Sequence, residues 1–205
     1  MTAELGFIHR FEAGTSDTTL LLLHGTGGNE HSLIGLARDL SPTAKLLSPR
    51  GKVLENGAPR FFRRLALGVF DEADLKAQAA DLARFVQDAA ERYGLAAGQV
   101  YALGYSNGAN MAAALLLLHP EVLAGGVLLR PVLPLEPPAL PDLSGKAAFL
   151  AAGRRDPWSP ADRVEALAQR LRQGGAEVEL RWQDAGHELH PEELEAARAW
   201  LARRV

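Results

Sequence analysis

The stretch Gly104-Tyr105-Ser106-Asn107-Gly108 constrains this 205-residue chain more than any other. The apolar run 100–103 before it is typical of a short buried strand, and 109–118, rich in alanine and leucine, is typical of a buried helix. A serine between two glycines at a strand-to-helix junction is the pattern of a nucleophile elbow, a sharp and strained turn. A glycine-rich turn that contains serine by chance is the alternative. The strand-like and helix-like neighbours favour the elbow.

Strand-like and helix-like segments alternate along the rest of the chain, which predicts a parallel sheet covered by helices on both faces. We therefore predict one α/β domain over residues 1–205. The expected strands are 6–11 at an edge, 18–23, 44–48, 100–103, 126–129, 147–152 and 176–182. The expected helices are 32–40, 72–93 with Asp71 as N-cap, 109–118, 160–172 and a last one that begins at Pro191.

Two segments do not fit this alternation. Residues 51–70 read as a long loop, and loops of this length in a compact domain are usually functional or disordered. The pair Phe61-Phe62 argues against disorder. Residues 131–141 are too rich in proline for regular structure.

Composition excludes several classes of protein. The chain has no cysteine, so a disulfide framework, a thiolate nucleophile and a cysteine-ligated metal are all excluded. A net charge of −3 without a basic run argues against binding to nucleic acid or acidic lipid. Residues 1–10 lack the pattern of a secretory signal, and the longest apolar run, 111–118, is too short to span a bilayer. We expect a cytoplasmic protein without stable membrane association.

A nucleophilic serine needs a base and a group that orients the base. In one large class of α/β enzymes the three residues follow in the order serine, acid, histidine, each on a loop after a strand. Ser106, Asp156 and His187 match this order and these positions. We predict that they form a catalytic triad.

Other acids and histidines fit less well. Asp142 lies in the proline-rich segment, Asp162 inside a helix, and Asp184 too close to His187 in sequence for a well-aligned hydrogen bond. Each has a simpler explanation as a surface or capping carboxylate. The remaining histidines lie on the edge strand, at helix ends or before the elbow, namely His9, His24, His31, His119 and His190. No histidine–carboxylate spacing resembles a metal site.

The glycine-rich loop 24–28 follows a predicted strand, so its backbone N–H groups lie at the carboxyl edge of the sheet. A phosphate cradle is one interpretation, but no G-x-x-x-x-G-K-[ST] pattern is present. We favour the second half of an oxyanion hole. His24 is expected to hold this loop in shape.

Several motifs together resemble the phospholipase/carboxylesterase family, within it the bacterial small carboxylesterases that include the methylhydroquinone-degradation hydrolases. The motifs are His24-Gly25-Thr26-Gly27-Gly28-Asn29-Glu30, Pro49-Arg50-Gly51, Phe61-Phe62-Arg63-Arg64 with Phe70-Asp71, the elbow extended to Asn110, and Gly186-His187. The resemblance runs from about residue 20 to the C-terminus. It implies an α/β-hydrolase fold without a cap domain.

The resemblance also implies roles for single residues. Ser106, Asp156 and His187 would be the triad, and the backbone N–H groups of Thr26 and Asn107 the oxyanion hole. Trp158 departs from the pattern, because relatives usually carry an aliphatic residue there. From their positions in the chain, we expect the pocket walls to include Phe61, Phe62, Leu133 and Trp158.

The resulting hypothesis is a serine carboxylesterase that cleaves small esters through an acyl-enzyme. Two alternatives are an acyl-protein thioesterase or lysophospholipase that uses the same site, and a non-catalytic binding scaffold with this fold. A small ester is the expected partner, with no cofactor, no metal and no nucleic acid. A homodimer is left open.

Overall fold

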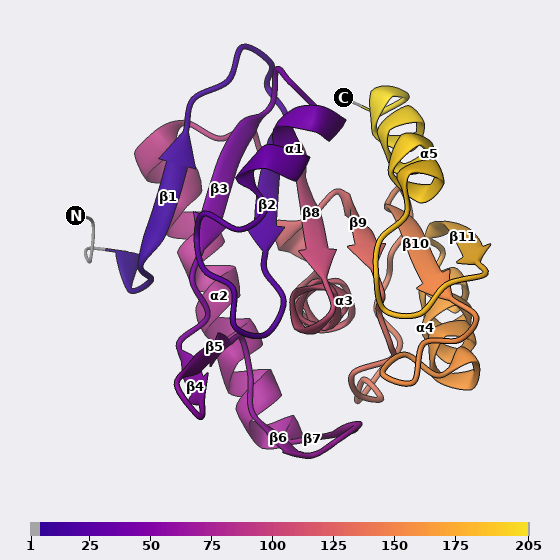
Figure 1. Cartoon of the computed structure of the whole chain (residues 1–205). Coiled ribbons are helices and arrows are strands. Elements are labelled where there is room, and N and C mark those ends of the chain that lie inside the picture. The colour runs from indigo at the N-terminus through magenta and orange to yellow at the C-terminus, as the bar shows by residue number, and fades with distance from the viewer. Residues whose placement is uncertain (1–4, 205) are drawn as a thin grey trace.

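The computed structural model describes residues 5–204. Residues 1–4 and 205 lie outside it, so the predicted domain 1–205 and the N-terminal stretch 1–10 are described only in part. A seven-stranded sheet with the order β1-β3-β2-β8-β9-β10-β11 forms the centre (Figure 1). Strand β1 pairs with β3 in antiparallel fashion, and every other pairing in this sheet is parallel. The strands are β1 (His9–Glu12), β2 (Thr19–Leu23), β3 (Lys45–Pro49), β8 (Val100–Tyr105), β9 (Gly125–Leu129), β10 (Ala147–Gly153) and β11 (Glu177–Gln183). The predicted, mostly parallel α/β fold is confirmed.

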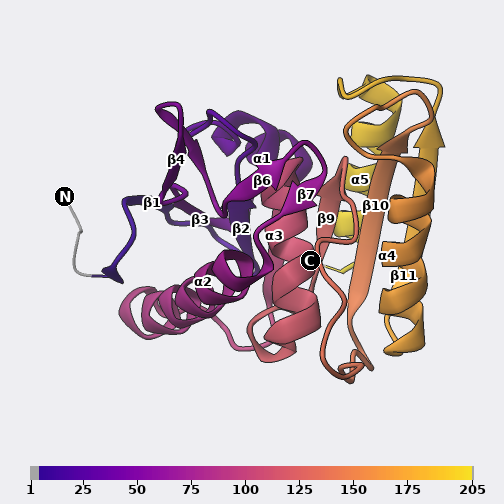
Figure 2. The same cartoon turned by 90° about the horizontal axis from the view of Figure 1, so that it is seen from below.

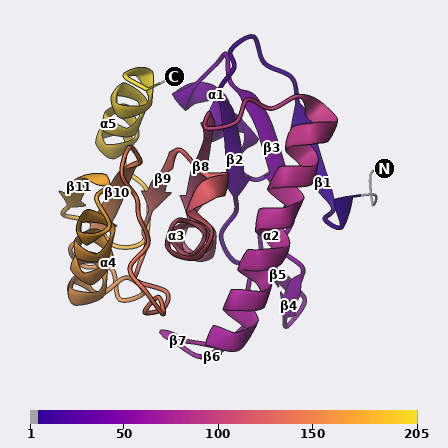
Figure 3. The ribbon, with the colours of Figure 1, turned by 180° about the vertical axis from the view of Figure 1, so that it is seen from behind.

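Helices cover both faces of this sheet. One face carries α1 (Ile34–Leu40) and α5 (Pro191–Ala202), and the other carries α2 (Glu72–Tyr93), α3 (Asn107–Leu118) and α4 (Ala161–Gln173). The view from below separates α1 from α2 and α3 on opposite sides of the strands (Figure 2), and the view from behind places α2 and α4 in front of the sheet (Figure 3). A 3-10 helix, Pro120–Val122, follows α3. In the range 5–204, no helix is both long enough and apolar enough to cross a membrane.

Burial on both faces explains why the central strands are apolar throughout. All five residues of β2 are buried, and so are all five of β9. Their side chains enter two separate clusters, one under α2, α3 and α4 and one under α1 and α5. A strand that packs helices on both sides cannot alternate between apolar and polar residues, which is the pattern expected of parallel sheets.

The segment between β3 and α2 differs from the predicted loop. It forms two small hairpins, β4 (Val53–Glu55) with β5 (Ala58–Arg60) and β6 (Arg64–Ala66) with β7 (Val69–Phe70). Asn56 and Gly57 turn the first hairpin with φ of 50° and 83°, the left-handed conformations that a two-residue turn needs. Residues 51–70, which contain these four strands, are here called the arm. The arm lies beyond the carboxyl ends of the sheet strands (Figure 1).

The elbow joins β8 to α3 with the strained backbone that the sequence predicts. Ser106 has φ 54° and ψ −115°, an unfavourable conformation for a residue with a side chain. A Cβ on Gly108 would overlap the carbonyl oxygen of Leu23, and one on Gly104 would lie 2.7 Å from the Cα of Ala109. The two glycines therefore let α3 approach β2 and β8 closely enough to hold the turn.

We predict that Gly108→Ala lowers the free energy of unfolding by about 3 kcal/mol, because the added methyl group must displace the end of β2. Gly35→Ala is the matched control. A Cβ at Gly35 meets nothing within 4 Å, and alanine in α1 should raise the stability by up to about 1 kcal/mol. Urea unfolding of the two variants measures both effects; equal stabilities would contradict the packing argument.

Candidate active site

Three side chains from separate loops meet at the carboxyl edge of the sheet. Ser106 follows β8, Asp156 follows β10 and His187 follows β11. The distance from His187 Nε2 to Ser106 Oγ is 2.9 Å, and that from His187 Nδ1 to Asp156 Oδ2 is 2.7 Å. The structure thus brings together all three residues of the predicted triad in one chain of hydrogen bonds.

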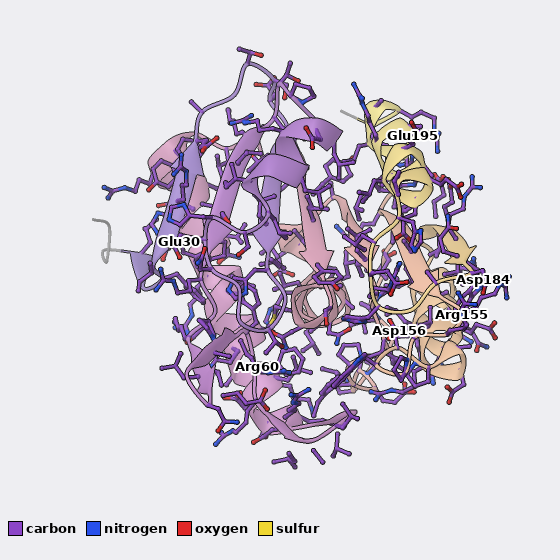
Figure 4. All side chains as sticks on the ribbon, viewed as in Figure 1. Glu30, Arg60, Arg155, Asp156, Asp184 and Glu195 are labelled. Carbon is purple, nitrogen blue, oxygen red and sulfur yellow. The ribbon has the colours of Figure 1, made fainter. Side chains whose placement is uncertain are left out.

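The carboxylate of Asp156 is buried and oriented on both of its oxygens. Oδ2 faces His187, and Oδ1 accepts a hydrogen bond of 2.9 Å from the backbone N–H of Trp158. The rejected candidate, Asp184, has a side chain that is 77% exposed and pairs with Arg155 at 3.3 Å. Figure 4 shows Asp156 inside the molecule and Asp184 beside Arg155 at its outer edge.

The two amides predicted to form the oxyanion hole are available on either side of Ser106. Within residues 5–204, no hydrogen bond uses the backbone N–H of Thr26 or of Asn107. Asn107 is the first residue of α3, so its amide adds the positive end of the helix dipole. Side chains fix both residues: Arg60 Nη1 donates to Thr26 Oγ1 at 2.7 Å, and the backbone N–H of Phe61 donates to Asn107 Oδ1 at 2.7 Å.

His24 holds the loop after β2, as the sequence predicts. Its Nδ1 lies 2.7 Å from the carbonyl oxygen of Gly25, and the backbone N–H of Gly51 donates to its Nε2 at 3.0 Å. The ring must therefore be neutral, with the proton on Nδ1. Burial is the main reason that the pKa of His24 is lowered.

An ion pair between Glu30 and Arg50 fixes the outer side of the same loop. The guanidinium donates to both carboxylate oxygens, from Nε at 2.6 Å and from Nη2 at 2.7 Å. These hydrogen bonds lower the pKa of Glu30 to about 2. Both residues belong to the motifs quoted above, and their role is to support the loop.

A fully buried ion pair holds the loop that carries His187. Arg130, just after β9, binds both carboxylate oxygens of Glu193 in α5 at 2.7 Å, and neither side chain has exposed surface. The same guanidinium donates to the carbonyl oxygens of Gly186, at 3.1 Å, and of Glu188. Arg130 is thus hydrogen-bonded to the backbone on both sides of His187.

Two cavities that share part of their lining flank Ser106. The larger has a volume of about 410 Å³ and is lined by Gly25, Thr26, Arg64, Tyr105, Ser106, Trp158 and His187. The smaller has a volume of about 50 Å³ and is lined by Thr26, Arg60, Arg64, Leu67, Gly68, Phe70, Ser106, Asn107, Asn110 and Trp158.

The predicted pocket residues take different places. Trp158 lines both cavities. Phe61 and Phe62 do not line either of them; they are almost completely buried in the core, where Phe61 packs on His24 and Phe62 on Phe70. Leu133 packs against the core as well. The hairpins of the arm turn these aromatic side chains inward, which explains the difference.

Sequence reasoning missed the polar residues that the arm brings to the site. Arg60 and Arg64 line the smaller cavity, and Glu55 bridges them. The Asn56-Gly57 dipeptide is a strong hairpin signal and could have shown that Glu55 and the residues after the turn lie side by side. For Arg130 no local pattern exists, because its partner is 63 residues away. In the described part of the chain, no group of three or more histidine or acidic side chains could hold a metal ion.

Comparisons with known proteins identify similar sequences and solved structures. The sequence profile of a family described as Phospholipase/Carboxylesterase matches residues 12–204. A Bacillus subtilis protein named as a hydrolase, MhqD, is 50% identical over 197 residues, 96% of this chain and 98% of that one. The solved carboxylesterase of Bacillus cereus is 44% identical with a TM-score of 0.92, covering 95% of this chain and 92% of that chain. The structure of YahD with malic acid is 32% identical with a TM-score of 0.90, covering 96% and 98%.

We predict that Arg130→Met lowers the free energy of unfolding by about 3–5 kcal/mol, because Glu193 is left charged and buried without a partner. Arg155→Met is the control, since its ion pair with Asp184 is exposed and worth less than about 1 kcal/mol. Denaturant titration of both variants tests this. Two small and equal losses would mean that the buried pair contributes no more than the surface pair.

We also predict a pH dependence of stability that arises from His24. Its folded pKa lies below the value of about 6.5 that an unfolded chain has. As the pH falls below 6.5, the unfolded state takes up a proton that the folded state refuses, so stability is lost at up to about 1.4 kcal/mol per pH unit. Glu30, with a pKa of about 2, loses its contribution only at lower pH.

The measurement is urea unfolding between pH 7 and pH 5. His24→Gln should have a shallower slope than the wild type over this range, by up to one proton. The other histidines are common to both proteins and cancel in the comparison. Parallel slopes would show that His24 accepts a proton in the folded protein.

Proposed function

We propose that this chain, which belongs to the phospholipase/carboxylesterase family of α/β hydrolases, cleaves small carboxylic esters with Ser106 as the nucleophile. Membership makes the chain an ester hydrolase. The observation that carries the rest is the hydrogen-bond chain from Ser106 through His187 to Asp156, at 2.9 Å and 2.7 Å. Its order and geometry match the requirements for an activated serine.

The first half of the reaction forms an acyl-enzyme. His187 Nε2 takes the proton of Ser106 while Oγ attacks the ester carbonyl carbon. Asp156 keeps the proton of the neutral imidazole on Nδ1 and stabilises the imidazolium that forms. His187 then gives its proton to the leaving alcohol oxygen, and the bond between carbonyl carbon and alcohol oxygen breaks.

The negative charge on the carbonyl oxygen is stabilised by the amides of Thr26 and Asn107. One such donor is typically worth about 3 kcal/mol in the transition state. The two are fixed before the substrate arrives, through Arg60 and the backbone of Phe61. Water then attacks the acyl-enzyme with His187 as base, and the acid is released.

The size of the cavities favours short substrates. The cavity beside Ser106 that His187 does not line is much the smaller of the two, about 50 Å³ against about 410 Å³, which favours a short acyl group. YahD was solved with malic acid, a short organic acid, which supports the same size of acyl group. Among described residues, no separate cap closes the larger cavity. The long-chain alternatives, lysophospholipids and acylated proteins, therefore rank behind small esters.

We predict that Ser106→Ala lowers kcat for p-nitrophenyl acetate by about 10⁶-fold and abolishes labelling by a fluorophosphonate. Asp156→Asn should lower kcat by about 10⁴-fold, because the imidazole then adopts the wrong tautomer. Asp184→Asn is the matched control and should have a rate close to that of the wild type, since this side chain is exposed and bound to Arg155.

Circular dichroism of each variant shows whether it is folded. A folded Ser106→Ala protein with near-normal turnover would refute the assignment of the nucleophile. A large loss in Asp184→Asn together with normal activity in Asp156→Asn would refute that of the acid.

A further inference from the structure

The smaller cavity next to Ser106 is lined mainly by hydrogen-bond donors. Arg60 and Arg64 enter it from the arm, and Asn107 and Asn110 enter it from α3. The backbone N–H of Phe61 binds Oδ1 of Asn107, and that of Val132 binds Oδ1 of Asn110 at 2.8 Å. Each side-chain amide oxygen thus already accepts a hydrogen bond from a backbone N–H group. A donor-rich space of this kind fits a group that only accepts hydrogen bonds.

Positive charge exceeds negative charge at this cavity. Glu55 is the carboxylate that pairs with the two arginines: Arg64 donates from Nε to Oε1 at 2.8 Å, and Arg60 Nη1 lies 3.4 Å from Oε2. Burial, and next the charge of Arg64, lower the pKa of Arg60. One carboxylate between two guanidinium groups leaves a net charge of about one unit uncompensated.

Donor atoms without partners remain at the cavity. Nδ2 of Asn107 is buried and makes no hydrogen bond within residues 5–204. No hydrogen bond in the same range uses the two Nη atoms of Arg64. Its guanidinium carbon lies 6.0 Å from the ring centre of Trp158, so the ring supports the cation from one side. A buried donor without a partner is costly unless a ligand supplies the acceptor.

The position of His187 distinguishes the two cavities chemically. His187 lines the larger cavity and is not among the residues that line the smaller one. Because the histidine protonates the leaving group, the alcohol part of an ester must lie on its side. The acyl part then extends toward the smaller cavity.

We propose that the preferred acyl group carries a carboxylate, which binds the guanidinium group of Arg64 and the side-chain Nδ2 of Asn107 in the smaller cavity. The substrates would be half-esters of short dicarboxylic acids. Hydrolysis consumes one water and yields the alcohol, the dicarboxylate and one proton. This inference rests on the proposed function and names the substrate class of that site.

Two ethyl esters of the same shape test the proposal. Monoethyl succinate carries the carboxylate, and ethyl 4-methylpentanoate has an isopropyl group in its place. The wild type should hydrolyse the half-ester with a kcat/KM at least about tenfold higher, since only the half-ester offers a charged acceptor to the free donors of Arg64. Proton release in a weakly buffered indicator solution reports both rates.

Arg64→Gln should reduce this preference about tenfold or more, and Arg64→Lys should keep part of it, because the charge remains while the paired donors are lost. Arg63→Gln is the matched control. Its side chain is 61% exposed, pairs with Asp71 and Asp74 and does not line either cavity, so its ratio should equal that of the wild type.

Equal kcat/KM values for the two esters in the wild type, or a preference for the neutral one, overturn the inference and leave the proposed function intact. An unchanged ratio in Arg64→Gln overturns the assignment of the carboxylate to Arg64. If the wild type fails to hydrolyse p-nitrophenyl acetate and is not labelled by a fluorophosphonate, the proposed function itself fails. These outcomes are therefore distinguishable.

Discussion

The contact between α3 and the end of β2 is the constraint on which the site depends. Gly108 lies directly against the carbonyl oxygen of Leu23, with no room for a side chain. This contact keeps Ser106 in a left-handed conformation and presents the first amide of α3 next to it. The loop that begins at His24 then leaves β2 at the same point, so one close approach places Ser106 next to the backbone N–H groups of Thr26 and Asn107.

Polar contacts between different segments then position the loop after β2, the arm and the loop that carries His187. His24 ties the loop after β2 to Gly51, where the arm begins. Arg60 reaches from the arm to Thr26, and the N–H of Gly27 donates to the carbonyl oxygen of Pro59 at 2.9 Å. Arg130 holds the His187 loop against α5. Each loop is thus fixed by a side chain of another element, and these contacts preorganise the site.

The main strands and helices, and the three residues that meet at the site, could be predicted because their signals are local. A fully apolar run, an N-cap at Asp71 or a serine between two glycines is visible within one short stretch. Boundaries were less accurate, as in the edge strand predicted at 6–11 and observed at His9–Glu12. The single-domain organisation and the catalytic roles remain predictions.

The arm and its inward-facing aromatic residues could not be predicted from periodicity. Strands of two or three residues are too short for an alternating pattern. Whether Phe61 and Phe62 face the core or the pocket depends on the turns before them. The pair Arg130–Glu193 is a contact between distant segments, and only the folded chain brings these residues together.

The arm has a further consequence for how this enzyme could diversify. Residues 51–70 supply the charged wall of the smaller cavity, whereas the sheet edge supplies Ser106, Asp156 and His187. Under the proposed function, the arm contributes to substrate choice, whereas the sheet edge carries the residues that cleave the bond. A variant with a different arm that keeps the hydrogen bond between Arg60 and Thr26 could hydrolyse esters of other acids. Ser106, Asp156 and His187 would stay in place.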